Sequence, residues 1–185
     1  AIIGVGPASA ATWSAQIPLD VSGNDGASTE SDVTAASGNV VNVLLWNDQS
    51  VVRVRSTDAG ASWSGSTVLG AKTGTATFRP EGIATSGTRV LALYSSSDGD
   101  VRKLLLRVST DGGAAFGSPI TLASYTDHAA RMGFGSVAVS GTRAIVAWTD
   151  VRTGKVLARR STNGGASWKP ATALGTTVRP WDGGA

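Results

Sequence analysis

The sequence lacks the features that disulfide bonds, thiolate metal sites, membrane-spanning helices and nucleic-acid-binding grooves require. Its 185 residues include no cysteine, which excludes disulfide bonds and thiolate-ligated metal sites. No apolar run approaches the roughly 18 residues that a membrane-spanning helix needs, so we expect no membrane span. The net charge is only +3 and the basic residues are scattered, which argues against a nucleic-acid groove.

No segment indicates a helix of useful length either, and the composition favours strands. The chain has 24 glycines, few charged residues, and many Ser, Thr, Ala and Val residues. Such a composition is typical of many short strands joined by turns, and the length suits one ordinary domain. The sequence therefore predicts an all-β protein.

One short motif occurs three times and predicts a tight turn at each place. The copies, which we call the first, second and third box, are Ser56–Trp63, Ser109–Phe116 and Ser161–Trp168, spaced by about 50 residues. In each, the Ser and the Asp or Asn can accept hydrogen bonds from nearby backbone N–H groups. A glycine supplies the positive φ, and an aromatic residue folds back as an apolar plug. The residues in these roles are Ser56, Asp58, Gly60, Trp63, Ser109, Asp111, Gly113, Phe116, Ser161, Asn163, Gly165 and Trp168.

This S-x-D-x-G-x-x-W pattern resembles the Asp-box (BNR) repeat of the sialidase-type β-propellers. The resemblance implies that each box joins the third and fourth strands of a blade, on the face opposite the active site. It also implies a structural role for the boxes, so we expect no metal ion there.

A second repeat places the blades. The Ser-Gly turns at Ser37-Gly38, Ser86-Gly87 and Ser140-Gly141 each separate a strand of small residues from an apolar strand. We therefore expect four-stranded antiparallel blades at about 30–70, 79–123 and 131–175, with partial blades at both ends.

The two ends are predicted to be incomplete. Residues 11–20 are similar to the segment after the first box and are expected to form an outer closing strand, and 178–185 to begin a further blade. Residues 1–10 resemble the remnant of a secretory signal; a strand with a degenerate box is the alternative. Three blades and two partial blades would leave the ring open, and an open ring exposes strand edges that are prone to pairing. We therefore expect the ring to be closed either by the remainder of a longer propeller or by a second copy of the chain.

Three arginines occur where inner strands begin, at Arg79, Arg131 and Arg179. Near one channel they could clamp a carboxylate through bidentate hydrogen bonds. Sialidases use an arginine triad in this way, and Phe78-Arg79-Pro80 is similar to the motif of their first arginine but lacks one intervening residue. Solvated strand ends are the alternative interpretation.

The catalytic candidates are fewer. Asp98 and Asp100 fall roughly where the acid loop of that family lies. His128, in a loop of the same face, could form an acid/base pair with Asp127 or contact a ligand; a solvated polar residue is the alternative. The Tyr–Glu nucleophile pair of sialidases has no counterpart here. Asp98 and Asp100 are also too few for Ca²⁺, which needs about six or more oxygen ligands, so we expect no cofactor.

The aromatic residues Trp46, Tyr94 and Trp148 are expected at one repeated position, the end of each second strand. They could stack on sugars or pack between blades. Together these patterns predict a secreted, sialidase-like propeller that binds a glycan or other extracellular ligand. An exo-sialidase with residues outside this chain, and a non-catalytic scaffold, are the alternatives.

Overall fold

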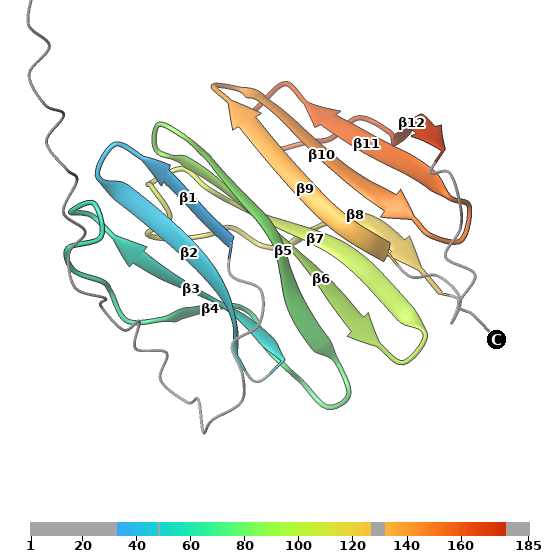
Figure 1. Ribbon diagram of the computed structural model, residues 1–185, viewed down its shortest axis with the longest axis horizontal. Coiled ribbons are helices and arrows are strands. Elements are labelled where there is room, and N and C mark those ends of the chain that lie inside the picture. Colours follow the sequence, from blue (N-terminus) through green and yellow to red (C-terminus); the bar gives the residue numbers. More distant parts are fainter. Residues whose placement is uncertain (1–32, 48, 127–131, 177–185) are drawn as a thin grey trace, which may run out of the picture.

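The computed structural model describes residues 33–47, 49–126 and 132–176, which form three four-stranded antiparallel sheets. Figure 1 shows the sheets following one another across the molecule in the order of the sequence. The strands of the first sheet are β1 (Val33–Ser37), β2 (Val40–Asn47), β3 (Ser50–Ser56) and β4 (Thr67–Gly70). Those of the second are β5 (Thr77–Ser86), β6 (Arg89–Asp98), β7 (Val101–Ser109) and β8 (Ile120–Tyr125). Those of the third are β9 (Met132–Ser140), β10 (Arg143–Asp150), β11 (Lys155–Ser161) and β12 (Thr172–Thr176).

Neighbouring sheets meet mainly through the first strand of each. Strand β5 contacts β1 on one side and β9 on the other, and it lies between the first and third sheets in Figure 1. Within each sheet the strands pair in chain order, so that β8 and β12 are the last strands of the second and third sheets. The sheets therefore fan out from a shared line of inner strands, as the predicted blades require.

Two of the three buried clusters among the described residues lie between sheets, and the third, which includes Val43 and Val54, belongs to the first sheet alone. Leu44 and Leu69 of the first sheet pack with Tyr94 of the second in one buried cluster. Leu93 of the second sheet packs with Val146 of the third in another. A strand that is covered on both faces is expected to read as a continuous apolar run, which explains the uninterrupted stretch from Val90 to Tyr94 in β6.

Each box closes its turn with the predicted hydrogen bonds. In the first box, Ser56 Oγ accepts from the backbone N–H of Asp58 at 3.2 Å and of Gly60 at 2.8 Å. Asp58 Oδ1 accepts from the N–H of Ser62 at 2.8 Å. The φ angles of Gly60, Gly113 and Gly165 are 91°, 86° and 93°, so the predicted positive φ is confirmed at all three.

The described ranges do not include the segments 1–10, 11–20 and 178–185, so the predicted signal remnant, closing strand and further blade lie outside them. Within the described ranges, no helix with the length and apolar character of a membrane span is found.

Candidate active site or binding cavity

The two ends of the sheets differ in chemistry. At one end, each box lies beside the turn that joins the first two strands of its blade. The N–H of Ala59 in the first box donates to Asn39 O at 2.8 Å, and the N–H of Gly112 in the second box donates to Thr88 O at 2.6 Å. The opposite end, which we call the top end, carries the β2–β3, β6–β7 and β10–β11 turns. A cavity of about 510 Å³ opens at the top end of the second sheet, lined by Thr77, Arg79, Glu81, Ser95, Ser96, Ser97 and Arg102.

Strand pairing explains why this cavity is polar. After the apolar run that ends at Tyr94, β6 continues through three serines. Ser95 lies opposite Arg79 of β5, and Ser97 lies opposite both Thr77 of β5 and Arg102 of β7. Directly opposite residues share a face of a sheet. On the face that carries Leu91 and Leu93 earlier in β6, hydroxyl and guanidinium groups therefore take the place of leucine side chains near the top end.

Glu81 closes the side of the cavity next to the third sheet. It lies in the β-bulge between Pro80 and Gly82, and its Oε2 accepts a hydrogen bond from the N–H of Gly135 in β9 at 3.0 Å. A Cβ at Gly135 would lie 3.0 Å from Leu93 Cδ2 and 3.3 Å from the Cβ of Glu81. Glycine therefore permits the close approach of β9 that holds this carboxylate.

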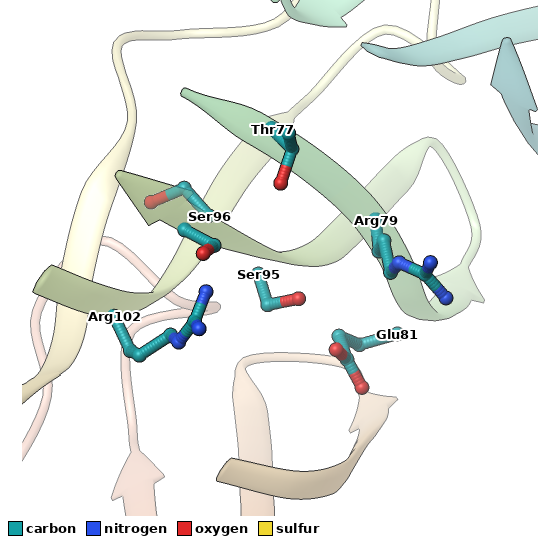
Figure 2. Close-up of a pocket in the computed structure, with 7 residues that line it drawn as sticks. Thr77, Arg79, Glu81, Ser95, Ser96 and Arg102 are labelled. Atoms are coloured by element: carbon teal, nitrogen blue, oxygen red, sulfur yellow. The ribbon is translucent and has the colours of Figure 1, made fainter. Parts of the chain in front are cut away.

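The two arginines lie on different sides of the cavity. Figure 2 shows Ser95 between Arg102 on one side and Arg79 with Glu81 on the other. The guanidinium carbon of Arg79 lies 4.3 Å from the centroid of the Trp46 ring, a cation–π distance. Trp46 belongs to β2 of the first sheet, so residues of two sheets set the position of this guanidinium group.

Both guanidinium groups keep their hydrogen-bonding capacity. With the other described residues, neither Arg79 nor Arg102 forms a hydrogen bond or an ion pair. Arg79 is exposed and Arg102 is half-buried. The cavity thus presents two cations and one carboxylate, and that carboxylate already accepts a backbone N–H.

Two of the three aromatic residues share one position as predicted, Trp46 does not, and Tyr94 lies four residues before the end of its strand rather than at it. Tyr94 pairs with Leu105 and Trp148 with Leu157, each four residues before the serine of its box. Trp46 pairs with Val51, which is five residues before Ser56. A displacement of one residue turns a side chain to the opposite face of its sheet.

Tyr94 and Trp148 pack between sheets. They are 1% and 3% exposed, and neither lines the cavity. Tyr94 Oη accepts from Arg107 Nε at 3.3 Å, while Trp148 Nε1 donates to Tyr125 Oη at 3.0 Å. Burial raises the pKa of both tyrosines above the ordinary value. Only Trp46 of the three reaches a residue that lines the cavity.

The catalytic candidates Asp98 and Asp100 lie at the exposed tip of the β6–β7 turn, on either side of Gly99. Asp98 Oδ1 accepts from Thr75 Oγ1 at 2.7 Å, and neither aspartate lines the cavity. Their catalytic role stays a prediction. Arg131, Arg179 and His128 lie outside the described residues, so the arginine triad and the His128 proposal stay predictions too.

Sequence reasoning did not select Arg102 or Glu81. A signal for Arg102 was present: a two-residue turn at Gly99-Asp100 places Arg102 opposite Ser97 by simple counting. Glu81 had no such signal, because its partner Gly135 is 54 residues away in the sequence. Within the described ranges, no group of three or more His, Cys, Asp or Glu side chains could hold a metal ion.

Comparisons with known proteins identify the fold. No family model and no curated protein matches the sequence. The structure is similar to that of an α-L-arabinanase of Penicillium chrysogenum complexed with arabinobiose, with a TM-score of 0.61 and 14% identity over 80% of this chain and 49% of that one. It is also similar to an α-L-arabinofuranosidase of Fusarium graminearum bound to an iminosugar inhibitor, with a TM-score of 0.52 and 15% identity over 77% and 47%.

The fold is a partial β-propeller. Each of the three sheets is a blade, as the repeat spacing predicted. The chain spans about half the length of those two proteins.

Proposed function

We propose that this chain is part of an exported Asp-box propeller of the sialidase type whose top-end cavity binds a carboxylate-bearing saccharide. The observation that carries the proposal is the pair Arg79 and Arg102, which face a cavity of about 510 Å³ without a carboxylate partner among the described residues. Guanidinium groups bind carboxylates through paired, charge-assisted hydrogen bonds.

The rest of the lining suits a sugar. The hydroxyls of Thr77 and the serine triplet can donate to and accept from sugar hydroxyls, and the cavity volume falls in the range of small-molecule sites, roughly 300–1,000 Å³. The Trp46 ring supports Arg79 from the first blade. The two similar structures are complexes with arabinobiose and with an iminosugar, and those ligands are consistent with carbohydrate binding by this fold.

The residues that line the cavity support saccharide binding without hydrolysis better than they support catalysis. A retaining sialidase needs an acid and a nucleophile, as retaining glycosidases generally do. Within the described residues, Glu81 is the one carboxylate that lines the cavity, and it is held by Gly135. The alternative, an exo-sialidase, would use Asp98 or Asp100 as the acid and a nucleophile from elsewhere in the protein.

The test is titration calorimetry with sialyllactose, with lactose as the neutral comparison. We expect sialyllactose to bind and lactose to bind at least about tenfold more weakly, the equivalent of roughly 1.4 kcal/mol. Arg79→Ala and Arg102→Ala should each remove most of that preference. Arg152→Ala is the matched control, because Arg152 is an exposed arginine of the third blade that does not line the cavity.

Equal affinity for both sugars, or a preference that persists in both cavity variants, would refute the carboxylate clamp. Absence of binding to any saccharide would favour the scaffold alternative. Release of the aglycone from a fluorogenic sialoside, abolished by Asp98→Asn or Asp100→Asn, would establish the glycosidase instead.

A further inference from the structure

The face of the third blade that is turned away from the second blade differs from its counterparts in exposure. Leu69, Leu122 and Leu174 occupy equivalent places on the fourth strands of the three blades. Leu69 and Leu122 are 3% and 1% exposed because the next blade covers them, whereas Leu174 is 63% exposed. Ile145 of β10, equivalent to the fully buried Leu91 of β6, is 44% exposed.

The two covered faces share a contact with the box of the following blade. The carbonyl of Gly112, the fourth residue of the second box, accepts from Arg55 Nε at 2.8 Å and from Asn42 Nδ2 at 3.2 Å, both in the first blade. The carbonyl of Gly164, the fourth residue of the third box, accepts from Arg89 Nη1 of the second blade at 3.0 Å. The second and third boxes thus dock on the preceding blade through the backbone carbonyl of their fourth residue and a guanidinium group, and in the second box Ala114 O also accepts from Arg53 Nη2 at 3.2 Å.

These contacts explain the residue at the fourth position. Gly112 and Gly164 are buried, and a Cβ at Gly164 would overlap the guanidinium group of Arg89, while one at Gly112 would lie 3.3 Å from Arg55 Nη2. The first box has Ala59 at this position, exposed and with a φ of 58°. Glycine is therefore present at both boxes that dock on an arginine, and alanine at the one that does not dock on a described blade.

The third blade carries both kinds of arginine. Arg143 follows the Ser-Gly-Thr turn as Arg89 does, and Arg160 immediately precedes the serine of its box as Arg55 does. Both are exposed, whereas Arg55 and Arg89 are half-buried. Arg143 and Arg160 line a cavity of about 540 Å³ together with Ile145.

We propose that this face is the docking surface for a further box, with glycine at its fourth position, carried by a blade that continues from the third. The carbonyl of that glycine accepts hydrogen bonds from Arg143 and Arg160, and the apolar side of the blade covers Ile145 and Leu174. This inference does not depend on the saccharide proposal, since the surface lies on a different blade from the cavity of Figure 2.

A second copy of the chain fits this surface less well. In a head-to-tail dimer the copy would have to present the first blade by the face turned away from the second. Val43 and Val54 on that face are already buried, at 6% and 1% exposure, and its box carries Ala59 in place of glycine. A continuing blade is therefore the occupant to which the structure points.

The test extends the 185-residue chain by a second copy of residues 77–126 after Ala185, which supplies the glycine of the second box. We expect the Leu174 and Ile145 methyl signals to become severalfold less sensitive to a soluble paramagnetic relaxation agent. The double variant Arg143→Ala/Arg160→Ala, or Gly112→Ala made in the appended copy alone, should restore the sensitivity. Arg152→Ala in the same extended chain is the matched control and should leave the protection in place.

An appended blade that folds but leaves both methyl signals exposed would overturn the proposal, as would protection that survives the double variant. Sedimentation of the unextended chain tests the other occupant: a dimer that Arg143→Ala/Arg160→Ala dissociates would show that a second copy takes the surface.

A second measurement applies if the extension does not fold, because the contact already exists inside the chain. Arg89→Ala should increase the hydrogen-exchange rates of the Gly164 and Gly165 amides severalfold, since the third box loses its anchor on the second blade. Lys103→Ala, at an exposed position of β7, should not change them. Unchanged rates in Arg89→Ala would show that the arginine does not hold the box, and the proposal would fail.

Discussion

At the scale of single residues, the serine of each box organises the turn more than the acidic residue does. Ser56, Ser109 and Ser161 are at most 2% exposed, and each Oγ accepts from two backbone N–H groups, as Ser109 does from Asp111 and Gly113. A buried hydroxyl that lacks these partners would be costly. The acidic residue is exposed, and it accepts hydrogen bonds from the first and seventh residues of the box, as Asp58 does from Ser56 Oγ and from the N–H of Ser62.

The first prediction concerns the charge of that exposed residue. Hydrogen bonds from Ser62 and then Ser56 lower the pKa of Asp58 to about 2, and a hydrogen bond from Ser109 is the main reason that the pKa of Asp111 is also lowered. A lowered folded-state pKa gives stability that is present above the unfolded value and is lost as the pH falls through the folded value. Asp58→Asn should therefore reduce the loss of stability between about pH 4 and pH 2, measured by urea unfolding at each pH.

The third box provides the reciprocal control. Asn163 occupies the acidic position there, and its Nδ2 donates to Ser167 Oγ at 2.8 Å. Asn163→Asp should add a pH-dependent component in the same interval. Identical pH profiles for the wild type and Asp58→Asn would contradict the assignment of acid sensitivity to this carboxyl.

At the scale of elements, each box is a turn whose tolerance of side chains depends on the blade beside it. Gly60 and Gly113 have similar φ angles, 91° and 86°. The nearest atom to a Cβ at Gly60 would be Trp63 Cζ2 at 3.6 Å, an ordinary contact, whereas a Cβ at Gly113 would overlap the Asn42 side chain of the first blade. The two glycines therefore share a backbone conformation, but only Gly113 is packed too tightly against the neighbouring blade to accept a side chain.

The second prediction compares these glycines. Gly60→Ala should cost about 1–2 kcal/mol of unfolding free energy, the strain of a left-handed backbone in a non-glycine residue. Gly113→Ala should cost that amount plus about 1–3 kcal/mol for overpacking against Asn42. Urea denaturation measures both. Equal costs would mean that the first and second blades are not packed as described.

At the scale of the whole molecule, stability depends on contacts between blades, because each blade alone has two apolar faces. Leu122 of the second blade is buried against the third, and Leu174 is its exposed equivalent. Isolated small sheets are at best marginally stable in water. The three blades should therefore unfold together rather than one by one.

The third prediction uses this equivalent pair. Leu122→Ala should destabilise the chain by about 2–5 kcal/mol, as buried leucines do. Leu174→Ala should change stability by no more than about 0.5 kcal/mol, as exposed positions do. Thermal and urea unfolding of both variants check this. A large effect of Leu174→Ala in the 185-residue chain would show that another surface already covers it.

How far the site could be predicted depended on whether its contacts are local. The register of the hairpin around Arg102 follows from counting outward from the Gly99-Asp100 turn. The side of the sheet on which Trp46 lies could not be predicted from its similarity to Tyr94 and Trp148. Trp46 is nine residues from the serine of its Ser-Gly turn, whereas Tyr94 is eight from the corresponding serine, and this single step reverses its face. The hydrogen bond between Glu81 and Gly135 joins two blades, and no sequence pattern in β5 or β9 predicts it.

The sequence by itself determined the turns and the strand order. A box turn closes through hydrogen bonds within eight residues and through the φ preference of glycine, so its residues carry nearly all the information that it needs. The tertiary structure determined which partners the individual arginine side chains have. Arg55 and Arg89 bind box carbonyls, whereas Arg79 and Arg102 line a cavity. They differ in the position of the neighbouring blade, which depends on contacts between residues that are 54, 57 and 75 positions apart in the sequence.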